Sequence, residues 1–161
     1  MADQGSAAIP GWELAAREQI RHTITAYAVA GDQGRLDDLA AQFTEDGVLE
    51  VRGRDTAHGR AEIIAMLSRH SDEGRPDGAA AGPFFVRHFV TNILVTDIAP
   101  AGAHAVAYFA VFTASGPDRW GRYRDHLVPD GGRWLLHHRT VRVDSAIEGS
   151  WYQRVHGSVG G

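Results

Sequence analysis

Apolar residues at helical spacing dominate the beginning of the chain. Ile20, Ile24 and Tyr27 follow one another at intervals of four and three residues, which places them on one face of an α-helix. Gly31 interrupts this pattern, and glycine commonly ends helices. The spacing therefore predicts an amphipathic helix that begins near Trp12 and ends at Gly31.

Two shorter helices and one strand are expected next. Apolar residues at helical spacing predict a helix over residues 34–43, and the Asp46-Gly47 pair predicts a turn before a strand at residues 48–51. A third helix is expected to begin after His58-Gly59, with Met66 on its apolar face.

The second half of the chain has the character of β-strands. Turns rich in glycine, proline or aspartate separate four β-type runs, over residues 84–97, 103–115, 120–128 and 133–144. Residues 71–83 have no periodic pattern and are rich in glycine, alanine, aspartate and proline, so we expect a loop there. Helices followed by antiparallel strands indicate the α+β class rather than a doubly wound parallel sheet.

The chain is expected to form a single domain. Its 161 residues match the usual size of one domain, and no repeat or linker divides them. We predict an N-terminal arm at residues 1–11, the domain at residues 12–145 and a C-terminal tail at residues 146–161. The first residues lack the basic and apolar regions of a signal peptide, and no apolar run could span a membrane, so we expect a cytoplasmic protein.

Composition and motifs exclude several classes of function. The net charge is −4, with 16 basic and 20 acidic residues and no basic cluster, which argues against nucleic-acid binding. The chain has no cysteine, and its histidines lack the spacing of a zinc site, so no metal is expected. The glycine-rich motifs that bind nucleotides are absent as well, and we expect no cofactor.

Several short segments resemble the SnoaL-like and scytalone-dehydratase-like proteins of the nuclear transport factor 2-like superfamily. Their order and spacing carry the resemblance, which covers residues 12–144. The segments are Tyr27–Asp32, Gly34–Leu39, Phe43–Asp46, His58–Ile63, Arg87–Asn92, Gly121–Asp125, Gly132–Leu136 and Arg139–Asp144.

The resemblance implies a cone-shaped α+β barrel. In this fold a strongly curved mixed or antiparallel sheet packs against three N-terminal helices around a central pocket. It also implies a homodimer that forms through the outer face of the sheet. Periodicity by itself gives only an α+β fold with a meander of strands.

Asp32 and His88 are the candidate catalytic residues. From its position alone, Asp32 is more simply a turn or helix-capping carboxylate, and His88 a buried histidine that needs a polar partner. The resemblance implies instead that this aspartate points into the pocket and works with a histidine on the sheet. Histidine is the natural general acid or base near neutral pH, and a carboxylate beside it would fix its tautomer.

Other side chains are expected to contact the substrate. If His88 points inward, the two-residue period of a strand also points Asn92 and Leu94 inward. A structural ion pair between Asp125 and Arg139 is expected within the last hairpin. The predicted substrate-binding residues are Tyr27, Asn92, Tyr123, Trp120, Phe112 and Met66.

The resulting hypothesis is a cofactor-independent enzyme acting on a small hydrophobic metabolite, such as a polyketide-like compound. General acid–base chemistry would carry out a dehydration, isomerisation or cyclisation. A non-catalytic binding or dimeric assembly module and an accessory subunit of an oxygenase are the alternatives. Epoxide hydrolysis ranks lower, because only Asp125 and Arg139 could supply part of the aspartate–arginine–aspartate arrangement that it uses.

Overall fold

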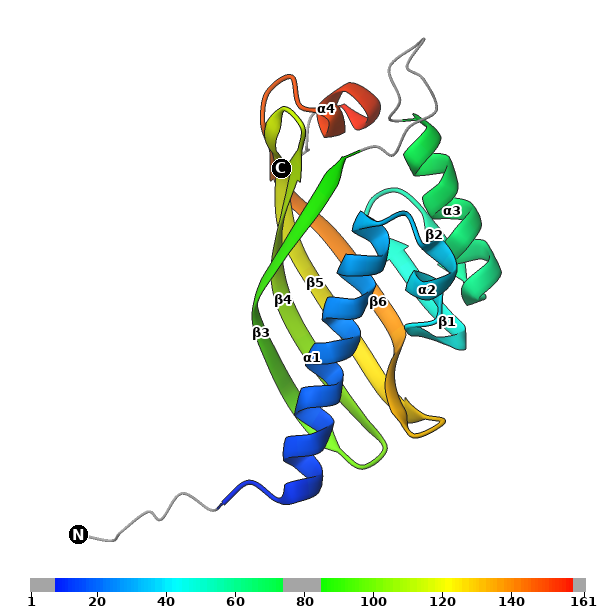
Figure 1. Cartoon of the computed structure of the whole chain (residues 1–161), viewed down its shortest axis with the longest axis vertical. Helices are drawn as coiled ribbons and strands as arrows, with labels where there is room; N and C mark the ends of the chain where they lie inside the picture. The colour runs from blue at the N-terminus through cyan, green and yellow to red at the C-terminus, as the bar shows by residue number, and fades with distance from the viewer. Residues whose placement is uncertain (1–7, 74–84, 158–161) are drawn as a thin grey trace, which may run out of the picture.

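A computed structural model describes residues 8–73 and 85–157. These residues form four helices and one six-stranded sheet (Figure 1). The helices are α1 (Gly11–Asp32), α2 (Leu36–Ala40), α3 (Gly59–Glu73) and α4 (Trp151–His156). The strands are β1 (Phe43–Val51), β2 (Thr56–His58), β3 (Val86–Ala99), β4 (Gly102–Thr113), β5 (Gly116–Asp130) and β6 (Arg133–Ala146).

The sheet is curved and mixed. Its strands lie in the order β2-β1-β6-β5-β4-β3, and every neighbouring pair is antiparallel except β1 and β6, which are parallel. The α+β class and the curved sheet packed against N-terminal helices are thus confirmed. None of the helices described is both long and apolar enough to cross a membrane.

Helix α1 lies along one face of the sheet and supplies much of the core (Figure 1). Ile20 and Ile24 on its apolar face are fully buried, as the helical spacing predicts. Thr23 on the same face is also buried, and its hydroxyl donates a 2.6 Å hydrogen bond to the backbone carbonyl of Trp134 in β6. This bond satisfies the hydroxyl that the face buries.

Strand β1 begins earlier than the sequence predicts. The expected helix over residues 34–43 ends at Ala40, and the strand runs from Phe43 through Asp46-Gly47, where a turn was predicted. The pairing with β6 shifts register over this stretch. A Cβ at Gly47 would lie 2.9 Å from the Cβ of Phe43 and 3.0 Å from the carbonyl oxygen of Leu136, so the glycine permits close packing inside the strand.

A β-bulge in β3 reverses the expected direction of two side chains. Asn92 has a φ of 53°, and the pairing with β4 shifts register between Thr91 and Leu94. One extra residue moves every later side chain to the opposite face. Asn92 and Leu94 therefore lie on the exposed face, and Val95 is buried instead, so the prediction that Asn92 points inward is wrong.

Two further segments differ from expectation. Helix α3 continues to Glu73, so the predicted loop at residues 71–83 begins in a helix, and residues 74–84 lie outside the described part. The expected C-terminal tail contains α4, whose first turn is capped by Ser150, because its hydroxyl accepts the backbone N–H of Gln153 at 3.2 Å.

Candidate active site

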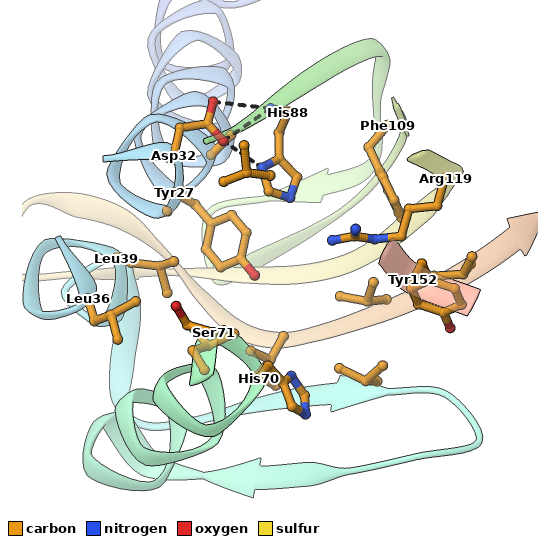
Figure 2. Close-up of a pocket in the computed structure, with 18 of the residues that line it drawn as sticks. Tyr27, Asp32, Leu36, Leu39, His70, Ser71, His88, Phe109, Arg119 and Tyr152 are labelled. Carbon is orange, nitrogen blue, oxygen red and sulfur yellow. Dashed lines mark hydrogen bonds and ion pairs between the residues drawn. The ribbon is translucent and has the colours of Figure 1, made fainter. Parts of the chain in front are cut away.

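A cavity of about 490 Å³ lies between the inner face of the sheet and the helices. Side chains from all four helices and from β1, β3, β4, β5 and β6 form its wall (Figure 2). Much of the wall is apolar, including Leu36, Leu39, Leu49, Val51, Phe109 and Val141. A volume of this size suits a small organic molecule.

Asp32 and His88 form a hydrogen-bonded pair in this wall. The Asp32 Oδ1 atom lies 2.6 Å from Nδ1 of His88, and both carboxylate oxygens accept the backbone N–H of His88 at 3.1 Å. The two side chains are only 11% and 20% exposed, respectively. Since Nδ1–H donates to the carboxylate, the lone pair of the neutral ring lies on Nε2, which points into the cavity (Figure 2).

The fold explains why these two residues meet. Asp32 is the last residue of α1, one residue beyond the predicted end of the helix, and so occupies no turn. His88 precedes the bulge of β3 and therefore keeps the inward direction that the strand period predicts. The pairing of the helix terminus with this strand brings together two residues that lie 56 positions apart.

Tyr27 and Tyr123 contribute to the cavity wall and enclose a buried cation. Their rings lie on the guanidinium of Arg139, at 4.2 and 4.1 Å from ring centroid to Cζ. Arg139 donates two hydrogen bonds to Asp125, at 2.8 and 2.7 Å, and both side chains of this pair are fully buried. Burial raises the pKa of Tyr27 and the pKa of Tyr123, so both hydroxyls stay protonated at neutral pH.

The Asp125–Arg139 pair lies in the protein core and not in the wall of the cavity. Burial alone would lower the pKa of Arg139, but the adjacent Asp125 raises this pKa above its ordinary value. Neither residue belongs to the cavity wall. The described residues therefore bring no aspartate–arginine–aspartate arrangement to the cavity, as epoxide hydrolysis of the known kind would need.

Three more predicted substrate contacts lie away from the cavity. Phe112 lies on the outer face of β4, where its ring meets Phe89 edge-to-face at 4.9 Å. Trp120 lies on the outer face of β5 and is 43% exposed. Met66 is 1% exposed and packs in the core, because the cavity side of α3 is formed by Leu67 and its neighbours. Side chains on the sheet's outer face or in the core do not line the cavity, so the structure does not bring these three residues to the Asp32–His88 pair.

The opposite end of the cavity contains residues that the sequence analysis missed. His70 lines this end from α3 and lies 2.9 Å from Asp55, measured from Nε2 to Oδ2. Arg119 reaches the wall from β5, and Tyr152 and His156 reach it from α4. The sequence could have indicated His70, because a histidine on the apolar face of a helix is expected to point toward the interior. A helix of six residues is too short to show a period.

The charges at this end of the cavity favour the neutral form of a histidine and the ionised form of a carboxyl group. Burial, together with the nearby Arg54, His70 and Arg119, lowers the pKa of His156 to about 4. The hydrogen bond from His70 lowers the pKa of Asp55, which is therefore ionised at neutral pH. Among the residues described, no group of three or more histidine, aspartate or glutamate side chains could hold a metal ion.

Comparisons with solved structures agree with this architecture, which is that of nuclear transport factor 2-like proteins with a cystatin-like fold. A variant of a protein of unknown function from Mycobacterium tuberculosis is 21% identical with a TM-score of 0.72, over 91% of this chain and 82% of that one. A candidate scytalone dehydratase from Novosphingobium aromaticivorans is 20% identical with a TM-score of 0.69, over 84% and 88%. A protein from Catenulispora acidiphila, in complex with S-DNPA, is 25% identical with a TM-score of 0.66, over 81% and 95%.

The sequence itself supplies the assignment to a family. No curated protein matches it. Residues 12–140, however, match the sequence profile of the SnoaL-like domain, and this stretch contains nearly all of α1, α2 to β5, most of β6 and both members of the Asp32–His88 pair. The chain therefore belongs to the SnoaL-like domain family.

Proposed function

We propose that the protein is a cofactor-independent enzyme that acts on a small hydrophobic metabolite in the cytoplasm by general acid–base catalysis. The observation that carries this proposal is the Asp32–His88 pair, which presents Nε2 of the imidazole to a largely apolar cavity of about 490 Å³. A base beside an apolar cavity suits proton abstraction from carbon. The similar Catenulispora protein is in complex with S-DNPA, which supports the proposal that this chain also binds a ligand.

The pair can perform both halves of a dehydration. Nε2 of His88 accepts a proton from a carbon next to a carbonyl group, and Asp32 stabilises the imidazolium that forms. The imidazolium then returns this proton to a hydroxyl group on the neighbouring carbon, which leaves as water with the bonding electrons of its C–O bond. Isomerisation and cyclisation use the same proton transfer with a different acceptor.

The neighbouring tyrosines are suited to hold the carbonyl oxygen during this step. Tyr27 and Tyr123 both line the cavity, and burial keeps their hydroxyls protonated. Arg139 lies against both rings, and a cation at this position makes a phenol a stronger hydrogen-bond donor. Tyr27 and Tyr123 would then stabilise the enolate oxygen that develops as the proton leaves carbon.

The test compares His88→Ala and Asp32→Asn with the wild-type enzyme on hydroxylated aromatic and polyketide-like ketones. A positioned acid–base group contributes about 10² to 10⁴ in rate, so we expect His88→Ala to lose at least about 10² in kcat/KM. His104→Ala is the matched control, since this histidine is on the exposed face of β4 and should leave the rate unchanged. Full activity in both His88→Ala and Asp32→Asn would refute the mechanism, whereas a wild-type protein that converts none of these compounds would favour the non-catalytic binding module.

We further propose that two copies associate through the outer face of the sheet. Large apolar side chains on β3, β4 and β5 gather on this face and are 39–60% exposed: Phe89, Leu94, Val106, Tyr108 and Trp120. Exposed apolar patches of this kind commonly mark an interface. A single chain of 17.5 kDa in sedimentation equilibrium would refute the dimer.

The expected result is a wild-type dimer that Phe89→Glu converts to a monomer, because the introduced carboxylate would be buried in the interface. Leu14→Glu is the control. Leu14 is 53% exposed, comparable with Phe89 at 60%, but it belongs to α1 and should not affect association. An unchanged dimer in Phe89→Glu would place the interface elsewhere.

A further inference from the structure

Basic side chains gather at the end of the cavity that α4 covers. Arg54, His70, Arg119 and His156 all belong to the cavity wall. They come from the turn after β1, from α3, from β5 and from α4, so four separate parts of the chain converge here. Among the described residues, the only carboxylate in the wall is that of Asp32, which is engaged by His88.

Two of these basic groups have acidic partners that lie outside the cavity wall. Asp118 is 1% exposed and pairs with Nη1 of Arg119 at 2.8 Å, while Asp55 pairs with His70 at 2.9 Å. Neither aspartate lines the cavity. At this end the cavity therefore meets the guanidinium of Arg119, while the carboxylates of Asp55 and Asp118 lie outside the cavity wall.

Arg119 is held in position for binding. Its guanidinium lies 5.0 Å from the ring of Trp151 and 5.4 Å from the ring of Tyr152, and Asp118 fixes it from one side. Figure 2 shows this guanidinium extending into the cavity, on the side away from Asp32. A planar arginine fork that is oriented before binding loses little entropy when it takes up a carboxylate.

The electrostatics of this end agree with the geometry. The pKa of His156 falls to about 4 because the group is partly buried and surrounded by Arg54, His70 and Arg119. Burial is the largest cause of this lower pKa, and the contribution of Arg54, His70 and Arg119 to it indicates a positive local potential. An anionic group placed there would gain from the same potential.

We infer that the α4 end of the cavity is a binding subsite for a carboxylate of the substrate, with Arg119 as its principal contact and His70 beside it. This inference rests on the proposed function, because it assigns the other end of the same molecule to His88. The substrate class is then an apolar ring or chain that carries a carboxylic acid at the end remote from the reacting carbon. Asp55 and Asp118 act as positioning residues for the two basic groups.

The experiment compares two probes of equal shape that differ in charge. Naphthalene-2-carboxylate and naphthalene-2-carboxamide are titrated into the full-length protein at pH 7, and binding is followed by isothermal calorimetry. We expect the carboxylate to bind about tenfold more tightly than the amide, which corresponds to about 1.4 kcal/mol. Equal affinity, or no binding of either probe, would overturn the inference.

Variants then assign the preference to this end of the cavity. Arg119→Gln should abolish the preference for the carboxylate, and Arg119→Lys, which keeps the charge and is the variant closer to the native side chain, should retain part of it. Arg122→Gln is the matched control, since Arg122 lies on the outer face of the same strand and should retain the full preference. A preference that survives Arg119→Gln would also overturn the inference.

One further variant separates this inference from the proposed function. His88→Ala removes the acid–base group without touching Arg119, and we expect it to leave the preference for the carboxylate within about twofold of the wild type. If the wild-type protein prefers the carboxylate but converts none of the test ketones, the proposed reaction alone is refuted. If the wild-type protein is active and His88→Ala abolishes the activity, but the wild type shows no preference for the carboxylate, the carboxylate subsite alone is refuted.

Discussion

The buried ion pair between Asp125 and Arg139 offers a test that needs no substrate. Both side chains are fully buried and joined by two hydrogen bonds. In Arg139→Met the methionine keeps the apolar contact with Tyr27 and Tyr123, but the Asp125 carboxylate loses its partner inside the core. Breaking a buried pair in this way costs about 3–5 kcal/mol.

The same hairpin contains an exposed ion pair that serves as the control. Arg122 and Asp144 form an ion pair between β5 and β6, at 3.1 Å, but their side chains are 38% and 33% exposed. An ion pair on the surface contributes about 0–1 kcal/mol, so Arg122→Met should change stability little. The two pairs differ mainly in burial, and the comparison isolates that variable.

Thermal unfolding followed by circular dichroism measures the difference. For a domain of 161 residues, 1 kcal/mol corresponds to a shift of about 2–4 °C, so Arg139→Met should lower the Tm by about 6–20 °C. The double variant Asp125→Asn/Arg139→Met should be more stable than Arg139→Met alone, because it also removes the unpaired negative charge of the buried Asp125 carboxylate. Equal losses in Arg139→Met and Arg122→Met, or strict additivity in the double variant, would refute the reasoning.

Three other outcomes are expected. Gly121→Ala should cost about 3 kcal/mol or more in urea unfolding, because its Cβ would lie 2.0 Å from a carbonyl oxygen of β6, whereas Gly11→Ala meets nothing within 4 Å and should be neutral. Thr23→Val should lower the free energy of unfolding by about 1 kcal/mol, since the buried carbonyl of Trp134 loses its hydrogen bond from the hydroxyl. An unchanged free energy of unfolding would contradict this. The pKa of His156 is about 4 in the fold and 6.5 ordinarily, so the unfolded chain binds more protons between these values, and stability should fall as pH decreases from 6.5 to 4. His156→Gln should flatten this pH dependence, and an unchanged slope would count against it.

The local periods of the sequence predict the central part of the site. Tyr27 lies on the buried stripe of a long helix, and His88 lies at an inward position of a strand, so both face the space between helix and sheet. The resemblance to a known family adds the aspartate. No periodic argument alone could place Asp32 against His88, because their contact depends on how a helix terminus docks on a strand 56 residues away.

The errors have local physical causes. A bulge at Asn92 reverses the strand's alternation, and its one readable signal was the tolerance of asparagine for positive φ. Strand β4 has large apolar side chains on both faces, with Phe109 buried and Tyr108 exposed, so the alternation of polarity that assigns a face is missing there. Phe112 was misplaced for this reason.

The parallel pairing of β1 with β6 has a consequence for synthesis on the ribosome. Leu49 pairs with Arg139, and Thr23 bonds the carbonyl of Trp134 across 111 residues of sequence. Contacts so distant along the chain form late, because a long loop must close first. A nascent chain halted before β6 would expose an unpaired strand edge and an uncovered apolar helix face, which are substrates for chaperones and proteases.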